Sequence, residues 1–179
     1  MELQLNFKLE KVNDISSLNA IKRSWLKEVK DEDSDFLDYL ESRIFRMCES
    51  VIERNDPADV WVLQSGEDGT PRALVELSDA SKAKIPSIKF LTLHIEPKYL
   101  IRKDEDLDRS RVIEVIKIIT AAMFESFSVA QNNHECQLKV LGGNELLKEL
   151  FPALILGNDP EKTGIEMRRQ SNWLLINKA

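Results

Sequence analysis

The chain has 179 residues and a formal net charge of −6, with 42% hydrophobic and 31% charged residues. These values are ordinary for a globular protein and predict one domain over residues 1–179. The acidic balance argues against a nucleic-acid partner, which needs a basic surface, and against docking to an anionic membrane. No stretch approaches the ~18 apolar residues of a membrane span, and the N-terminus lacks a secretory signal pattern.

Cysteine and histidine are too few and too scattered for a metal centre. Cys48 and Cys136 form no Cys-x-x-Cys pair, and His94 and His134 are the only histidines. A zinc site needs three or four such ligands at regular spacing, so we expect none. Two isolated cysteines instead indicate reduced, partly buried thiols in a cytoplasmic protein.

The first half of the chain predicts a strand, two helices and a hairpin. Strict alternation of apolar and polar residues indicates the strand, and apolar residues three or four positions apart indicate the helices. Asn13 and Asp14 offer an N-cap for the first helix. Two glycines and a proline mark the hairpin turn at 65–71. The expected ranges are 3–9 for the strand, 14–30 and 34–55 for the helices, and 60–64 and 72–77 for the hairpin.

The second half alternates strands with helices. Residues 111–127 form the longest apolar helix candidate, which we expect to be buried on more than one side. Pro152 is expected to end a short helix, because proline removes a helical hydrogen bond. The expected ranges are 88–95 (strand), 111–127 (helix), 136–141 (strand), 145–151 (helix), 157–164 (loop) and 165–177 (strand). This order predicts an α/β (α+β) fold, a mixed central sheet with helices on both faces.

The order of elements resembles the GNAT superfamily of acyl-CoA-dependent N-acetyltransferases over nearly the whole chain. The sequence Leu-Thr-Leu-His-Ile-Glu-Pro at 91–97 is similar to the family's central strand, and 111–127 to the helix after its phosphate loop. Residues 143–151, beginning Gly-Asn-Glu-Leu, resemble the family's Asn-x-x-Ala-x-x-Leu-Tyr segment. The resemblance implies that the central strand splays from its neighbour beside Ile95 and leaves a wedge for the pantetheine arm of CoA.

Two departures from the family pattern predict a degenerate site. Residues 99–109, where the family has a glycine-rich phosphate loop, contain no glycine and several acidic side chains. Side chains there would crowd a pyrophosphate and carboxylates would repel it. Phe151 stands where the family usually has a tyrosine that protonates the leaving thiolate.

The resemblance nominates site residues, each with a plainer structural alternative. Glu96 or His94 would be the general base, and Tyr99 could protonate the thiolate; His94 and Glu96 also fit a half-buried histidine and a strand-end carboxylate. CoA would be held by the backbone near Leu93 and Ile95 and by the side chains of Arg102, Lys103 and Asn144. Local salt bridges are the plainer role for Arg102 and Lys103, and a helix N-cap is the plainer role for Asn144.

Two functions therefore stay open. The first is an N-acyltransferase that uses acetyl-CoA or another acyl-CoA on a small-molecule or protein amine. The second is a catalytically inactive GNAT-like binding or assembly module, without conventional CoA binding. A homodimer is compatible with either function. A continuous ladder between residues 88–95 and 136–141 would count against CoA binding.

Overall fold

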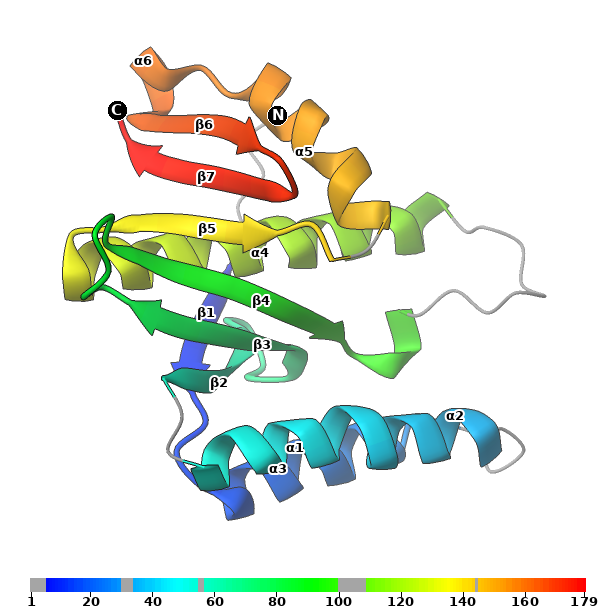
Figure 1. The fold of residues 1–179 in the computed structure, drawn as a ribbon. Helices are drawn as coiled ribbons and strands as arrows, with labels where there is room; N and C mark the ends of the chain where they lie inside the picture. Colours follow the sequence, from blue (N-terminus) through cyan, green and yellow to red (C-terminus); the bar gives the residue numbers. More distant parts are fainter. Residues whose placement is uncertain (1–5, 30–33, 55–56, 100–108, 144) are drawn as a thin grey trace. The chain divides into compact units, whose positions relative to one another are not determined.

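The computed structural model describes the chain except residues 1–5, 30–33, 55–56, 100–108 and 144 (Figure 1). The elements of the first half are β1 (Phe7–Lys11), α1 (Ile15–Leu26), α2 (Ser34–Tyr39), a π-helical turn η1 (Leu40–Phe45), α3 (Arg46–Arg54), β2 (Ala58–Ser65) and β3 (Pro71–Ala80). Those of the second half are β4 (Ser87–Ile95), a 3₁₀ turn η2 (Pro97–Tyr99), α4 (Arg109–His134), β5 (Gln137–Leu141), α5 (Glu145–Gly157), α6 (Pro160–Thr163), β6 (Ile165–Gln170) and β7 (Trp173–Lys178).

The strands form one mixed sheet, which confirms the expected α/β class. Their hydrogen-bonded order is β1-β2-β3-β4-β5-β7-β6. β4 and β5 are parallel, as expected for strands joined by a helix. β1 pairs with β2, and β7 with both β5 and β6, in antiparallel fashion.

The described residues separate into two compact units, one from residues 6–75 with 93–122 and one from residues 76–92 with 123–179. We call them unit 1 and unit 2 and describe each by itself. None of their helices is long and apolar enough to cross a membrane.

The core of unit 1 lies between the N-terminal helices and β2 and β3. Asp14 caps α1 by accepting the Ser17 N–H at 2.7 Å, as the sequence predicts. Trp25 is fully buried, packs edge-on against Phe45 at 5.7 Å between ring centroids, and donates its indole N–H to the Pro71 carbonyl at 3.1 Å. The rest of this cluster is apolar: Val12, Leu18, Ile21, Val29, Leu40, Ile44, Cys48, Val60, Val62 and Leu74.

The other face of these strands lies toward α4. β1 and β2 place Leu9 opposite Leu63, which is fully buried. Because side chains alternate along a strand, Leu63 points away from the face that holds Val60 and Val62. Figure 1 shows α1 and α3 on one side of β1 and β2 and α4 on the other. Unit 1 therefore carries helices on both faces of its strands.

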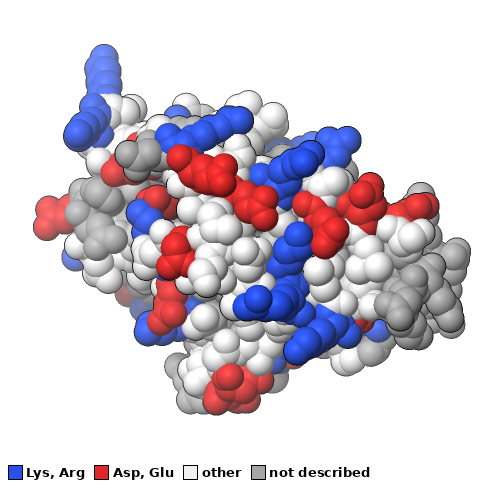
Figure 2. Space-filling model, turned by 90° about the horizontal axis from the view of Figure 1, so that it is seen from below, with Lys and Arg blue, Asp and Glu red and all other residues white. Residues whose placement is uncertain are grey.

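The outer surface of α1 and α3 carries both signs of charge. Lys22 of α1 pairs with Glu41 of η1 at 3.4 Å. Figure 2, seen from the side of these helices, shows Lys and Arg side chains beside Asp and Glu side chains. Charges of both signs therefore lie close together on this face.

In unit 2, α5 follows β5 in the chain and ends later than the sequence predicts. The predicted end of the helix before Pro152 is wrong, because α5 runs through Pro152 to Gly157. Leu147 and Phe151 on this helix are buried, and their burial offsets the backbone hydrogen bond that proline cannot make.

The end of the chain corrects two more predictions. Residues 157–164 are not loop throughout, because Pro160–Thr163 form α6 with Gly164 as a left-handed C-cap. Residues 165–177 are not one strand but the hairpin β6–β7, with a two-residue turn in which Ser171 has a positive φ of 55°. Without a glycine at this turn, its composition gave little indication of a break.

Gly142 generates a stability prediction in unit 2. A Cβ at this position would lie 3.1 Å from the Phe151 ring and 3.2 Å from the Asn172 carbonyl oxygen, which already accepts the Gly142 N–H at 2.7 Å. We expect Gly142→Ala to lower the free energy of unfolding by about 1–3 kcal/mol, because this packed site cannot take another methyl group. Urea denaturation measures the change.

The neighbouring glycine supplies the matched control. A Cβ at Gly143 would meet nothing within 4 Å. Gly143→Ala should be neutral or slightly stabilising, because it only restricts the unfolded chain. Equal effects of the two substitutions would contradict this account of the packing.

Candidate functional site

The last residues of β4 are the first part of the candidate site. β4 pairs with β5 from Ser87 opposite Gln137 to Phe90 opposite Val140. Beyond Phe90 the strand continues to Ile95, and every residue from Leu91 to Ile95 is only half-buried. β5 itself ends at Leu141, so this ladder covers four of its five residues and the end of β4 lies beyond it. Leu93 and Ile95, the two backbone positions predicted to hold CoA, lie on this half-buried segment.

His94 lies on the same segment with an unsatisfied ring nitrogen. Its Nε2 atom is buried and has no hydrogen-bond partner in the described part of the chain. Burial lowers the pKa of His94 below its ordinary value of 6.5. The imidazole is therefore neutral near pH 7, the form in which it can accept a proton.

Glu96 is enclosed immediately after β4. Its side chain is completely buried, and its Oε2 atom accepts a hydrogen bond from Arg72 Nη1 at 3.0 Å and an ion-pair contact from Lys98 Nζ at 3.2 Å. The Glu96 N–H also donates to the Arg72 carbonyl at 2.8 Å. Oε1 is buried without a partner among the described residues. Two cations thus hold one carboxylate oxygen and leave the other free to accept a proton or a hydrogen bond.

Two further carboxylates surround this ion-pair cluster. Glu28, just after α1, lies 4.0 Å from Lys98 Nζ, and burial together with the charge of Glu96 raises its pKa. Asp68, in the β2–β3 turn, contacts Arg72 Nη2 at 3.5 Å. A hydrogen bond from the Thr70 N–H is the main cause that lowers the pKa of Asp68 to about 2. The Arg72 guanidinium therefore bridges Glu96 in the interior and Asp68 at the surface.

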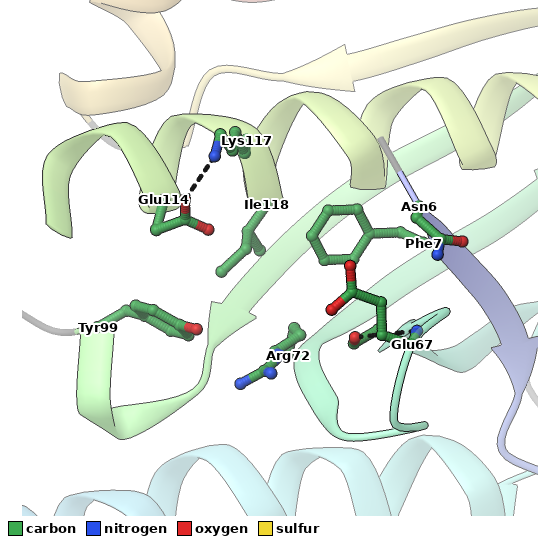
Figure 3. Close-up of a pocket in the computed structure, with 9 residues that line it drawn as sticks. Asn6, Phe7, Glu67, Arg72, Tyr99, Glu114, Lys117 and Ile118 are labelled. Atoms are coloured by element: carbon green, nitrogen blue, oxygen red, sulfur yellow. Dashed lines mark hydrogen bonds and ion pairs between the residues drawn. The ribbon is translucent and has the colours of Figure 1, made fainter. Parts of the chain in front are cut away.

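Tyr99 joins this cluster to a hollow. Its N–H donates to the Glu96 carbonyl at 3.0 Å, and its ring lies 5.0 Å from Lys98 Nζ and 5.9 Å from the Arg72 guanidinium carbon. Figure 3 shows the Tyr99 side chain reaching from η2 into the hollow, where the Arg72 guanidinium points toward it. The hydroxyl of Tyr99 is therefore placed at a cavity, as a proton donor needs to be.

The hollow is small and bounded by charged groups. Its volume is about 200 Å³, and its walls come from β1, the β2–β3 hairpin, η2 and α4: Asn6, Phe7, Ser65, Glu67, Arg72, Tyr99, Glu114, Lys117 and Ile118. On α4, Lys117 donates to Glu114 at 2.6 Å, on the side facing Tyr99 in Figure 3. The two cations of the hollow are thus already bound to carboxylates, and Glu67 adds a further negative charge. The balance favours a small cationic or neutral guest over an anion.

Sequence reasoning identified only part of this site. Glu96 and Tyr99 do belong to the cluster, and His94, Leu93 and Ile95 lie just before it on β4. Arg72 and Glu28 were missed, because nothing in their local sequence marks them and they meet Glu96 only through the fold. Three predicted CoA contacts, Arg102, Lys103 and Asn144, lie outside the described residues, as does most of the predicted degenerate phosphate loop.

Phe151 is a core residue of unit 2. It is 1% exposed, and its ring approaches the backbone at Gly142. Among the described residues, no group of three or more His, Cys, Asp or Glu side chains is arranged to hold a metal ion.

Comparisons with solved structures return matches at low identity, among them two N-acetyltransferases. The crystal structure of AtaTR bound with AcCoA is 15% identical, with a TM-score of 0.47 over 95% of this chain and 92% of that chain. The N-acetyltransferase PseH of Campylobacter jejuni is 11% identical, with a TM-score of 0.40 over 96% of both chains. A chimera of the Vibrio cholerae spermidine N-acetyltransferase SpeG and hSSAT is 14% identical, with a TM-score of 0.45 over 97% of this chain and 95% of that chain. All three scores lie below 0.5, so the fold class rests on the strand order and pairing of this chain itself.

Sequence comparison gives one curated relative and no family profile. The human "B-cell scaffold protein with ankyrin repeats" is 30% identical over 93 residues. The match covers 49% of this chain and 12% of that protein. No protein-family profile matches the chain.

The ion-pair cluster predicts a large cost for removing Arg72. Arg72→Met would leave the buried Glu96 carboxylate with Lys98 alone, and we expect the free energy of unfolding to fall by about 3–5 kcal/mol. Urea denaturation measures this loss. Lys162→Met is the control, because Lys162 pairs with Asp159 at 2.9 Å but is 84% exposed, and such a pair contributes at most about 1 kcal/mol. Equal losses would show that Glu96 does not depend on Arg72.

His94 predicts a pH dependence of stability. Its pKa in the folded chain lies below the ordinary 6.5, so the unfolded chain binds more protons as the pH falls below that value. The stability that the neutral imidazole contributes is complete above pH 6.5 and is lost as the pH falls through the folded pKa. The wild type should therefore lose more stability than His94→Gln between pH 7.5 and pH 5. The raised pKa of Glu28 makes both proteins more stable, not less, as the pH falls toward its ordinary pKa of 4.5, so it cancels in the comparison. If the stabilities of the wild type and His94→Gln changed equally with pH, His94 would not have this role.

Proposed function

We propose that this chain is a divergent GNAT-like N-acyltransferase, which transfers an acyl group from acyl-CoA to a primary amine. The observation that carries the proposal is the end of β4, where the strand continues for five half-buried residues after its pairing with β5 stops at Phe90. An extended segment of this kind has backbone N–H and C=O groups and side-chain surface to offer a narrow, extended ligand arm. This fits the place at which the resemblance puts the CoA arm, beside Leu93 and Ile95.

Acyl-CoA would supply the thioester carbonyl that an amine can attack. In this proposal the backbone N–H groups near Leu93–Ile95 polarise that carbonyl and stabilise the negative charge that develops on its oxygen. His94 accepts a proton from the attacking amine, because its imidazole is neutral and its Nε2 atom lacks a partner among the described residues. We prefer His94 to Glu96 for this step, since the Glu96 side chain is completely buried and already engaged in ion pairs with Arg72 and Lys98.

Tyr99 is the proposed proton source for the leaving sulfur. Phe151, at the family's usual position, is buried and has no exchangeable proton. Tyr99 instead lines the hollow, and its ring lies against Arg72 and Lys98 beside Glu96. The new C–N bond forms, the C–S bond breaks, the amine proton goes to His94, and the thiolate receives the Tyr99 proton.

A second candidate function is a binding or assembly module without catalysis. It is favoured by the enclosure of Glu96 between two cations and by the 30% identity to part of a human scaffold protein. A cytoplasmic location, consistent with the buried thiols of Cys48 and Cys136, belongs to both proposals.

Calorimetry with acetyl-CoA and with CoA at low salt separates the two functions, because phosphate contacts are then least screened. Under the acyltransferase proposal, both bind in the micromolar range and Arg102→Ala or Lys103→Ala weakens binding severalfold. Lys162→Ala, a change of equal charge on the exposed surface of α6, should leave binding unchanged. Absence of heat up to millimolar CoA would remove the acyltransferase proposal and leave the binding module.

A release assay for free CoA thiol over a panel of primary amines then tests the chemistry. His94→Gln should lower the turnover rate by about 10²–10⁴-fold while leaving the affinity for CoA unchanged, as expected when a general base is lost. Tyr99→Phe should also lower turnover. If His94→Gln turned over at the wild-type rate, the proton would have another acceptor, with Glu96 Oε1 the next candidate.

A further inference from the structure

β6 is the edge strand of the described sheet, and most of its side chains are exposed. The strand order ends in β7-β6, and β6 pairs with β7 from Ile165 opposite Lys178 to Gln170 opposite Trp173. Only Ile165 and Met167 are partly covered; the other four residues of β6 are exposed. An exposed edge presents backbone N–H and C=O groups to which another strand can pair.

The register fixes which backbone groups of β6 point outward. The Ala179 N–H donates to the Gly164 carbonyl at 2.9 Å, so these two residues form a hydrogen-bonded pair. Hydrogen-bonded and non-hydrogen-bonded pairs alternate along antiparallel strands. The N–H and C=O groups that point away from β7 are therefore those of Ile165, Met167 and Arg169.

The outward groups at Ile165 already have partners within unit 2. The Asn158 side-chain amide donates to the Ile165 carbonyl at 2.7 Å, and the Ile165 N–H donates to Thr163 Oγ1 at 3.3 Å. The outward backbone groups of Met167 and Arg169 bond no other described residue. The Arg169 side chain donates to the Ser171 carbonyl at 3.1 Å. The free part of the edge is therefore short and centred near Met167.

The charges on either side of Met167 have opposite signs, so they can pair with those of a second copy of β6. Glu166 and Arg168 are both exposed and, being two residues apart, lie on the same face of β6. If a second copy pairs antiparallel with Met167 opposite Met167, each Glu166 lies opposite Arg168 of the second copy. These positions are the non-hydrogen-bonded ones, where opposite side chains are closest.

The competing register does not share this complementarity. If Met167 lay opposite Arg169 of the second copy, more backbone groups would bond, but the two Arg168 side chains would lie directly opposite each other. Like charges at such positions are destabilising. A uniformly acidic or basic strand from another protein would likewise place a like charge opposite Glu166 or Arg168. The edge therefore fits a second copy of itself better than a strand of a single charge.

We propose that two copies of this chain associate through antiparallel pairing of their β6 strands about Met167. Each Met167 then donates its N–H to the Met167 carbonyl of the other copy, and two Glu166–Arg168 ion pairs fix the register. The proposal is independent of catalysis, because β6 contains none of the residues assigned to the acyltransferase site.

Sedimentation velocity of the full chain across a range of concentrations tests the proposal. The wild type should form dimers. Glu166→Arg or Arg168→Glu alone should raise the dissociation constant at least tenfold, because each places like charges opposite each other twice. The double variant Glu166→Arg/Arg168→Glu should restore dimers, because it rebuilds both ion pairs with the signs exchanged. The competing register would not give this restoration, since it leaves like charges opposite each other at position 168.

Two further variants keep the test independent of net charge and of misfolding. Arg169→Glu changes the charge as much as Arg168→Glu, but its side chain lies on the other face of β6, so dimers should persist. Met167→Pro removes an N–H that bonds nothing within one described copy and should abolish dimers while leaving the melting temperature of the monomer nearly unchanged. A wild type that stays monomeric, or dimers that survive Met167→Pro and both single charge reversals, would overturn the proposal.

Discussion

The burial of Glu96 between Arg72 and Lys98 is the interaction on which the described site depends. A carboxylate that is completely buried costs several kcal/mol unless cations compensate it. Here the cations come from the start of β3 and from η2, while Glu28 and Asp68 approach from the end of α1 and from the β2–β3 turn. One buried charge thus ties four separate segments of unit 1 together. It also fixes the direction in which the chain leaves β4, and with it the position of Tyr99.

This arrangement has a chemical consequence. The Glu96 carboxylate is completely enclosed and engaged with Arg72 and Lys98, so this residue is better suited to hold the surrounding segments in place than to meet a substrate amine. His94 has the opposite environment, since burial without a charged partner keeps it neutral. The two candidate bases identified from sequence are therefore separated by their surroundings, and the proposed division of roles follows from that difference.

Two strand segments of the described chain have incomplete pairing, and they suggest different uses. The end of β4 continues beyond its ladder with β5 and is half-buried, which suits a narrow ligand. The edge of β6 is exposed, and its charges at Glu166 and Arg168 would pair with those of a second, two-fold-related copy. At the β6 edge, unpaired backbone groups rather than a conspicuous pocket indicate where a partner would bind.

The sequence by itself determined the local elements and the fold class. Apolar periodicity located α1 and the α2–α3 region, the hairpin composition located β2 and β3, and the alternation at 88–95 located β4. These features depend on residues close together in the chain, where period and capping decide the conformation. The same local reasoning failed at Pro152 and at the β6–β7 turn, because burial of Leu147 and Phe151 and the pairing of two strands outweighed local preference. Only the tertiary structure decided that β7 lies between β5 and β6, and that Arg72 meets Glu96 across 24 residues of sequence. Such contacts are set by strand order and register, which are properties of the whole sheet and leave no mark on the residues beside them.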